Sequence, residues 1–277
     1  MELWSSFQDF LQYDFLFNAL VGTLILALTC GLVSPLIIAR KQSFMGVAVS
    51  HSAIFGVAVG LVFFSKEQTF PVFLVTLLST FALVGLLAFA DFREKLPSDS
   101  LIGVFFTTSM GLGILIYTLV HQNSGDLLSY LFGNILLLTT TDLMIALIVL
   151  LMTFPLIIIP FKKWIYFTFD REAAMISGLP TSLYHYTFSF MITLIIVSSM
   201  KIAGTVLVNT LLLIPGIVGL KLAKNVWTAF VYSVLFSLLS SVVSLVMANY
   251  LNTPSGATLA VGQCLLLMLF LGLKRIL

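Results

Sequence analysis

The stretch FMGVAVSHSAIFGVAVG, residues 44–60, has the composition of a membrane span, yet it places a histidine, His51, about two helical turns in. A helix needs about 20 mainly apolar residues to cross a bilayer. Apolar blocks of that length follow one another along the chain, separated by short polar breaks. None of them alternates over about ten residues as an outer-membrane barrel strand does. The stretch therefore belongs to a helical membrane protein.

The composition excludes a water-soluble domain. Of the 277 residues, 60% are hydrophobic and only 9% are charged, whereas soluble domains carry about 25% charged residues. So few charges cannot cover a water-facing surface, and the bilayer must replace water over most of it. We expect an all-α polytopic membrane protein in which residues 1–277 form a single transmembrane domain.

Nine blocks are long enough to span, with boundaries good to a few residues. The predicted spans are 16–39, 45–64, 70–90, 99–120, 141–160, 182–200, 203–221, 226–249 and 255–273. The block 127–139 is too short to cross, and we expect a re-entrant or interfacial helix there. Pro215 and Gly216 are expected to break the block 203–221, so eight spans are the alternative.

Basic residues predict the orientation. If the N-terminus is outside and the C-terminus is cytoplasmic, two of the 13 basic residues, Lys66 and Lys201, fall on outside loops. The other eleven fall inside: Arg40, Lys41, Arg93, Lys95, Lys162, Lys163, Arg171, Lys221, Lys224, Lys274 and Arg275. This bias follows the positive-inside rule, and it favours nine crossings over eight.

The N-terminus and the cysteines carry weaker signals. Residues 1–15 contain three acids and no base, which is the wrong charge for a secretory signal peptide. We therefore expect an amphipathic lead-in at the membrane surface. Cys30 and Cys264 both lie in apolar runs and outside any zinc-type pattern, so we expect two buried free thiols.

Absent motifs narrow the function. The sequence has no G-x-x-x-x-G-K-[ST] phosphate loop and no H-E-x-x-H zinc motif, and its histidines, His51, His121 and His185, are far apart. The chain therefore lacks the catalytic residues expected of a membrane enzyme, and ATP-driven transport would need a separate ATPase subunit. A secondary transporter is the competing class. Such proteins usually keep acids within the membrane for ion coupling, whereas here nearly every acid lies near a span end or in a loop.

The largest predicted cytoplasmic loop, residues 161–183, contains the pattern of a short capped helix. Asp170 is a good N-cap, and Glu172 lies in the first turn, where the helix dipole favours an acid. The residues that favour the helix and then end it are Ala173, Ala174, Gly178 and Pro180. Such a helix either lies on the membrane or docks a cytosolic partner, and the pattern alone leaves both open.

Four stretches carry a family resemblance: RKQSFMGVAVSHSAIFGVAVG (40–60), DLLSYLFGNILLLTTTDL (126–143), FDREAAMISGL (169–179) and MKIAGTVLVNTLLLIPG (200–216). In this order they resemble the permease subunit of bacterial ABC importers for zinc and manganese, the ABC-3 family. The resemblance implies a type II importer bundle in the bacterial cell (inner) membrane. Its implied partners are a second copy of itself, cytosolic ATP-binding subunits and an extracytoplasmic solute-binding protein. No tightly bound cofactor and no nucleic acid are expected, because the divalent metal is the transported substrate.

The resemblance also assigns residues. The segment 169–179 matches the family's coupling helix, whose matching residues here are Asp170, Arg171, Glu172, Ala173, Ala174 and Gly178. His51 matches the histidine of the family's D-x-x-x-H pathway motif, but Val47 stands where the family has the aspartate. Positions i and i+4 share a helix face, so an Asp–His pair would offer an oxygen and a nitrogen ligand together. Val47 offers only methyl groups.

Two interpretations of His51 remain open. It is either a metal-pathway residue or a neutral histidine hydrogen-bonded to a backbone carbonyl or to a hydroxyl, such as that of Ser50, Ser52 or a residue of another span. Two His51 rings facing each other across a dimer axis would compensate for Val47 and favour zinc over manganese. The sequence alone does not choose between zinc, manganese and iron.

Other polar residues within the spans have a structural interpretation beside the functional one. Asn209, with Thr205 and Thr210, either packs helices or lines the metal pathway. We expect Thr107, Thr108 and Ser109 to be helix contacts, and residues 253–257 to form an outer turn.

Overall fold

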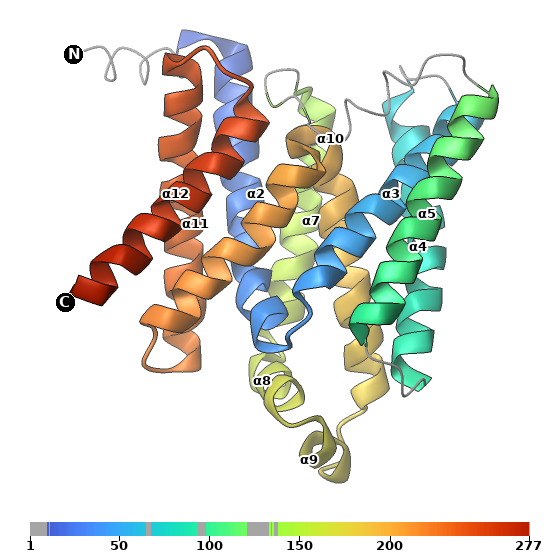
Figure 1. The fold of residues 1–277 in the computed structure, drawn as a ribbon, viewed down its shortest axis with the longest axis vertical. Coiled ribbons are helices and arrows are strands. Elements are labelled where there is room, and N and C mark those ends of the chain that lie inside the picture. Colours follow the sequence, from blue (N-terminus) through green and yellow to red (C-terminus); the bar gives the residue numbers. More distant parts are fainter. Residues whose placement is uncertain are drawn as a thin grey trace.

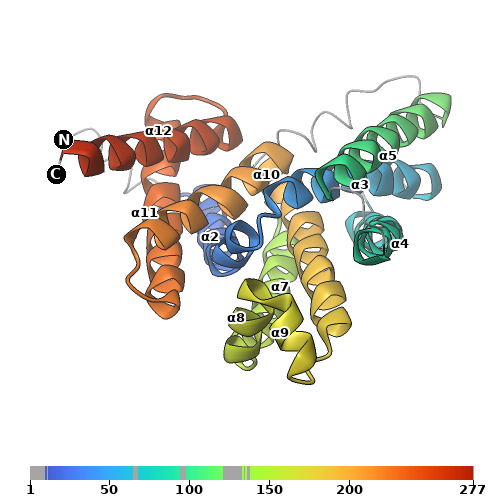
Figure 2. The same ribbon diagram turned by 60° about the horizontal axis from the view of Figure 1, so that its bottom comes forward.

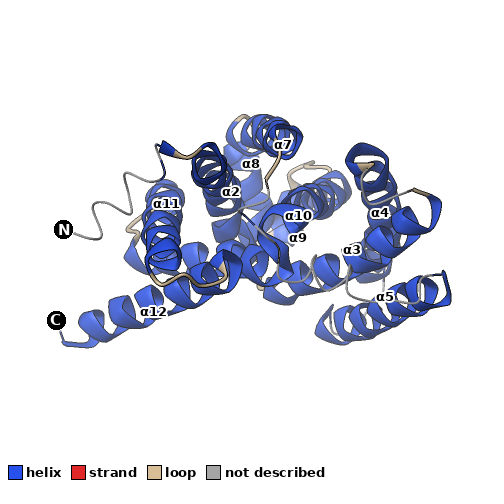
Figure 3. Ribbon diagram, turned by 90° about the horizontal axis from the view of Figure 1, so that it is seen from above, coloured by secondary structure: helices blue, strands red, loops and turns tan. Residues whose placement is uncertain are grey.

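The computed structural model describes residues 12–64, 68–93, 98–120 and 138–276, together with Phe10, Gly133 and Ile135. All the secondary structure in these residues is helical (Figures 1 and 3). The helices are α2 (Asp14–Ala39), α3 (Ser43–Phe63), α4 (Thr69–Arg93), α5 (Ser98–Val120), α7 (Thr140–Ile158), α8 (Phe161–Phe169), α9 (Arg171–Ile176), α10 (Thr181–Leu222), α11 (Val226–Tyr250) and α12 (Ser255–Ile276). The expected lead-in 1–15, the block 127–139 and His121 lie largely or wholly outside the described residues.

The long helix α10 is two spans joined by a reversal. Gly204 alone in α10 has non-helical backbone angles, φ 73° and ψ 162°. Figure 1 shows α10 rising from its start near α9 and then descending towards α11. The arms, Thr181–Met200 and Ile202–Leu222, each qualify as a membrane span, so the described residues contain nine candidate spans. The prediction of nine crossings is confirmed over the alternative of eight.

The prediction that Pro215 and Gly216 break the helix is wrong, because the helical conformation continues through both residues. The Gly216 N–H donates to Ser34 Oγ of α2 at 2.6 Å. A Cβ on Gly216 would lie 2.6 Å from the Ser34 carbonyl oxygen. Proline is tolerated in a membrane helix where a neighbouring helix pairs the freed backbone groups. The Ile-Pro-Gly sequence therefore marks the close approach of α2 to α10.

Two trios of helices form the sides of the molecule. One comprises α3, α4 and α5, and the other comprises the second arm of α10 with α11 and α12. Figure 1 shows α3 and α5 slanted beside the upright α4, and the second arm of α10 and α12 slanted beside the upright α11. The chain runs upward in α3 but downward in the second arm of α10, so the two trios run in opposite directions. Figure 2 shows the slanted helices α3, α5, α12 and the second arm of α10 along the same side. Helix α2 and the first arm of α10 pack between the trios.

Glycines hold α3 close to its neighbours. A Cβ on Gly113 of α5 would lie 2.8 Å from the Phe55 Cα, and one on Gly56 of α3 would lie 2.7 Å from the Thr76 carbonyl oxygen of α4. Small residues allow backbones to approach closely where apolar burial gives no drive for association. The position of His51 is therefore fixed from two sides by backbone contact.

The segments that connect the spans lie at two opposite ends of the molecule. Figure 1 shows the α2–α3 turn, α8, α9 and the α10–α11 turn at the lower end of the molecule, and the α11–α12 turn at the upper end. The basic residues of those lower segments thus gather at one end: Arg40, Lys41, Lys162, Lys163, Arg171 and Lys224. This shared side agrees with the predicted loops, and its assignment to the cytoplasm stays a prediction.

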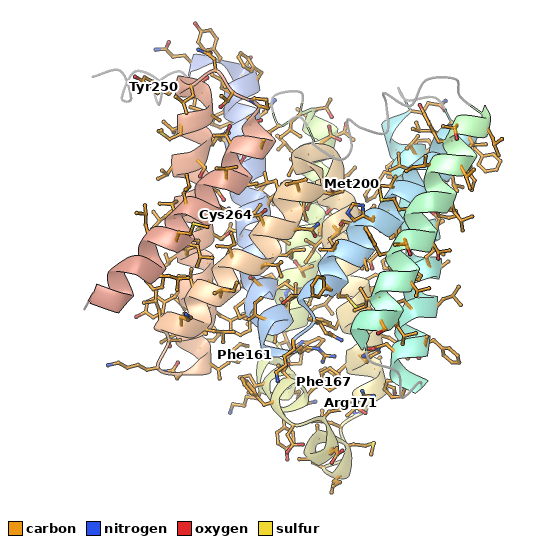
Figure 4. All side chains as sticks on the ribbon, viewed as in Figure 1. Phe161, Phe167, Arg171, Met200, Tyr250 and Cys264 are labelled. Atoms are coloured by element: carbon orange, nitrogen blue, oxygen red, sulfur yellow. The ribbon has the colours of Figure 1, made fainter. Side chains whose placement is uncertain are left out.

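The two cysteines differ. Cys30 is buried as expected, but the expectation is wrong for Cys264, which is exposed. Helix α12 packs against α10 and α11, and Cys264, labelled in Figure 4, is exposed on this helix. An apolar run does not distinguish a bilayer-facing thiol from a core thiol.

We expect Gly204→Ala to destabilise the fold by about 1–3 kcal/mol, since this backbone region is accessible almost only to glycine. The Cβ of an alanine would suffer this strain whatever space surrounds it. The measurement is the unfolding midpoint of the purified protein in detergent. Gly85→Ala is the matched control, because a Cβ at Gly85 has no heavy atom within 4 Å. Equal midpoints for the two variants would contradict the role of Gly204.

Candidate functional site

Helix α3 leaves one stripe of side chains partly exposed. The α3 stripe consists of Val47, His51, Phe55 and Val59, at intervals of four residues, while most positions between them are buried. Residues four apart lie on one face of a helix. His51 is thus partly exposed at the surface of the spanning region rather than enclosed in the core.

The second arm of α10 carries a similar stripe beside it. Its partly or largely exposed positions are Val206, Asn209, Thr210, Leu213 and Ile217. Helices α3 and α10 are joined by a hydrogen bond in which Asn209 Nδ2 donates at 3.1 Å to Oγ of Ser50, a buried residue of α3. The structure therefore places Asn209 in contact with the residue that precedes His51 in the sequence.

The ring of His51 has an unused ligand atom. Its Nδ1 is buried and has no hydrogen-bond partner, and Phe106 of α5 packs edge-on against the ring at 4.6 Å between centroids. The neighbouring serines are occupied elsewhere: Ser50 Oγ donates to the Val47 carbonyl at 2.8 Å, and Ser52 Oγ donates to the Ala48 carbonyl at 2.7 Å. The alternative of a histidine bonded at Nδ1 to either serine is therefore not what the structure has.

Asn209 also has a spare ligand atom, because its Oδ1 is buried and unpartnered. An unpaired polar atom in a membrane span is costly, but other spans hold such atoms as well, for example His185 Nδ1 and Gln263 Oε1. His51 and Asn209 differ from these two residues in being partly exposed. A neutral imidazole nitrogen and an amide oxygen can bind a divalent metal, although weakly. Val47 adds no ligand, and the described residues contain no group of three or more His, Cys, Asp or Glu side chains able to hold a metal.

The expectation of helix contacts is confirmed for Ser109 but wrong for Thr107 and Thr108, which are exposed on α5. Ser109 Oγ lies 3.2 Å from Ser52 Oγ and joins α5 to α3. Thr107 and Thr210 hydroxyls donate to carbonyls in their own helices. His185 is buried, with Nε2 3.1 Å from the Ala88 carbonyl oxygen, so it links α10 to α4.

The expected capped helix in the lower loop is present as α9. Asp170 Oδ1 accepts from the Ala173 N–H at 2.8 Å, which makes Asp170 the N-cap. Gly178 has φ 82°, the left-handed conformation that ends helices. Helix α10 begins directly after Pro180. Local sequence signals therefore predicted both ends of α9 correctly.

The sequence did not predict that apolar side chains of α9 are exposed. Ile176 is 85% exposed and Met175 is 63% exposed, whereas Ala174 is 0% exposed. Arg171 and Glu172 are exposed as well. Met175 and Ile176 are adjacent, so this end of α9 is a candidate interaction surface. The sequence did contain one signal for this exposure: Met175 and Ile176 end a helix that is too short to bury every apolar side chain.

A family model described as the ABC 3 transport family matches residues 12–274 of this chain. The chain belongs to the ABC 3 transport family. It is therefore a multi-pass permease of bacterial ABC metal transport systems, as the four sequence stretches predicted. Within an ABC transporter of this family the permease is not the catalytic subunit.

Relatives of this ABC 3 permease carry metal-transport names. It is 29% identical to a probable metal transport system membrane protein of Thermotoga maritima, over 93% of this chain and 89% of the relative. It is 30% identical to the manganese import system permease protein ScaB of Streptococcus gordonii, over 94% and 93% of the two chains. Among solved structures, PsaBC from Streptococcus pneumoniae in complex with Fab matches with a TM-score of 0.84 at 26% identity, over 96% and 94% of the chains.

We expect Asp170→Ala to raise amide hydrogen exchange in residues 171–176 about fivefold, since loss of a helix cap costs about 1 kcal/mol. Asp170→Asn is the matched control, because asparagine caps equally well. Hydrogen exchange followed by mass spectrometry measures the effect. Unchanged exchange in Asp170→Ala would show that the cap does not hold α9 together.

Proposed function

We propose that this permease carries a divalent transition metal, with zinc slightly favoured over manganese, along a pathway lined by His51 and Asn209. The observation that supports this most directly is the α3 stripe. It exposes a histidine within a span, beside an asparagine, and each side chain has a buried polar atom without a partner. Buried polar groups are normally hydrogen-bonded, and a passing cation gives these two atoms a partner.

The ligand set supports the preference for zinc. Imidazole suits zinc, whereas carboxylate and carbonyl oxygens suit manganese. Val47 removes the carboxylate that the family motif places one turn before the histidine. A second copy of the chain would bring a second His51 to the exposed stripe, and two imidazoles suit zinc further. A sparse set is compatible with transport, because conduction needs a site weak enough to release its ion.

The protein is proposed to work as a homodimer by alternating access. An extracytoplasmic binding protein would deliver the metal to the end of the molecule opposite α9. Two ATPase subunits would bind at α9, where Met175 and Ile176 offer an exposed apolar surface flanked by Glu172 and Arg171. The chain has no phosphate loop of its own, which supports a separate source of ATP hydrolysis.

Membership in an ABC family favours this mechanism over an ion-gradient transporter. The buried acid Asp142 also has a structural role, because it forms a capping box with Thr139 at the start of α7. That place at a span end does not suit a coupling acid, which would lie within the membrane.

We expect His51→Ala to lower zinc uptake at least tenfold when the permease is reconstituted with its ATPase and binding protein. A lost metal-ligand interaction of about 1.4 kcal/mol corresponds to a factor of ten. Uptake of zinc and manganese into proteoliposomes is the measurement. Phe55→Leu, one turn further along the α3 stripe, is the control and should transport normally. Normal uptake by His51→Ala would reject the proposed site.

We expect Val47→Asp to shift the preference towards manganese. The new carboxylate would share a helix face with His51 and add the oxygen ligand that manganese favours. Competition of manganese against zinc in the same proteoliposomes measures the shift. An unchanged preference would mean that position 47 does not face the ion.

We expect Ile176→Asp to prevent stable binding of the ATPase subunit. A charge would replace the most exposed apolar side chain of α9, so an apolar contact would become a buried unpaired charge. Co-purification of the ATPase with the permease measures this. Lys163→Ala, an exposed change on α8, is the control. Undiminished co-purification of Ile176→Asp would place the docking surface elsewhere.

A further inference from the structure

The turn between α2 and α3 is attached to the rest of the molecule by the side chain of Arg40. Arg40 follows α2 directly, and its Nε donates to Gln42 Oε1 at 3.0 Å. Its guanidinium lies 4.3 Å from the ring centre of Phe167 and 4.7 Å from that of Phe188. Both distances are within the range of about 6 Å for cation–π attraction.

The two rings belong to a larger aromatic group that joins α7, α8 and α10. Trp164 of α8 packs edge-on against Tyr184 of α10, with 5.0 Å between the ring centres, and its ring centre lies 6.1 Å from that of Phe188. Its indole N–H donates to the Leu156 carbonyl of α7 at 2.8 Å. Trp164 and Phe167 are almost fully buried. Arg40 therefore inserts into a rigid aromatic group that leads into α9.

A second arginine joins α9 itself to α4. The Arg171 guanidinium lies 4.4 Å from the ring centre of Phe92, the residue before the last of α4. The preceding residue, Asp91, lies 3.9 Å from His185 Nε2. Figure 4 shows Phe167 and Arg171 together at the lower end of the molecule. The first residue of α9 is thus held against the lower end of a span.

Arg40, Arg171 and Asp91 act on one another electrostatically. Burial lowers the pKa of Arg40 to about 10, the nearby Arg171 also lowers it, and Asp91 opposes the shift. A group with this pKa is still cationic at neutral pH. The three charges come from the α2–α3 turn, α9 and α4, so these segments meet at one charged cluster.

We propose that Arg40 is a positioning residue that makes the α2–α3 turn move with the coupling segment, here defined as Phe161–Gly178. Movement of α9 on an ATPase would then shift the start of α3, the helix that carries His51. This inference rests on the proposed function, since it assumes a metal pathway at His51 and an ATPase at α9. It adds a specific mechanical link between the two sites.

The chemistry requires arginine at this position. The guanidinium is planar and stacks on aromatic faces, whereas the lysine ammonium is a compact, strongly hydrated charge. Lysine at position 40 would keep the charge and much of the length but lose the stacking between two rings. Arg40→Lys thus separates the proposed link from simple electrostatic anchoring.

The test is the ratio of metal transported to ATP hydrolysed, in proteoliposomes that contain the permease, its ATPase and its binding protein. We expect Arg40→Lys and Phe167→Leu to assemble and hydrolyse ATP, while zinc transported per ATP falls at least fivefold. The control is Lys41→Gln, which removes the neighbouring exposed charge and should stay within twofold of the unchanged protein.

Two results would overturn the proposal. The first is an unchanged transport ratio in both Arg40→Lys and Phe167→Leu. The second is failure of both variants to assemble with the ATPase, since that would make the cluster purely structural. If the unchanged complex hydrolyses ATP but moves no metal, the proposed function fails instead, and the distance measurement below still tests the link.

That measurement uses spin labels at Lys41→Cys and Lys163→Cys, both exposed positions, with Cys264→Ser to remove the exposed native thiol. We expect the distance between the labels to be the same with and without bound ATP, because the turn and the coupling segment move together. Arg40→Lys should make that distance depend on nucleotide. A nucleotide-dependent change of several ångströms in the protein with Arg40 would overturn the proposal.

Discussion

The reversal at Gly204 is the constraint on which the pathway depends. A chain in a bilayer must pair its backbone polar groups, so a turn between two spans without an intervening loop has few solutions. Glycine reaches the required φ of 73° and ψ of 162°, and the backbone of Ala203 and Gly204 lies against Gly133, where a Cβ would overlap it. Because α10 turns here, its second arm returns beside α3 and brings Asn209 to Ser50. Without the reversal, Asn209 would not reach α3.

The fold was largely predictable from the sequence because bilayer thickness and charge asymmetry act on simple composition. Both ends of α9 were also predictable, since Asp170 and Gly178 act on their own neighbourhood. The location of the break in α10 was not. Pro215 is the stronger local signal, but α2 pairs the backbone beside it through Ser34, and the break falls instead at a glycine whose contact comes from a distant segment.

The candidate site, like the fold, was predictable from the sequence only in part. His51 and Asn209 could be named from the sequence because polar residues within spans are rare. Their proximity, their unpaired atoms and the exposure of Met175 and Ile176 could not, because each depends on which helix packs where. The contact of Arg40 with Phe167 and Phe188 joins residues far apart in the chain. In the sequence, the basic residues of the α2–α3 turn indicated only the orientation of the chain in the membrane. In the fold, Arg40 of that turn also connects the coupling segment to α3.

The most direct test of the account is whether the α3 stripe faces an aqueous metal pathway. Single cysteines along α3, in a Cys264→Ser background of the assembled transporter, are exposed to a charged, membrane-impermeant thiol reagent. We predict reaction at positions 47, 51, 55 and 59 but not at the buried positions 48 and 52, and we predict that zinc slows the reaction at position 47, beside His51. Absence of reaction at all four stripe positions, or reaction that zinc does not affect, would contradict it.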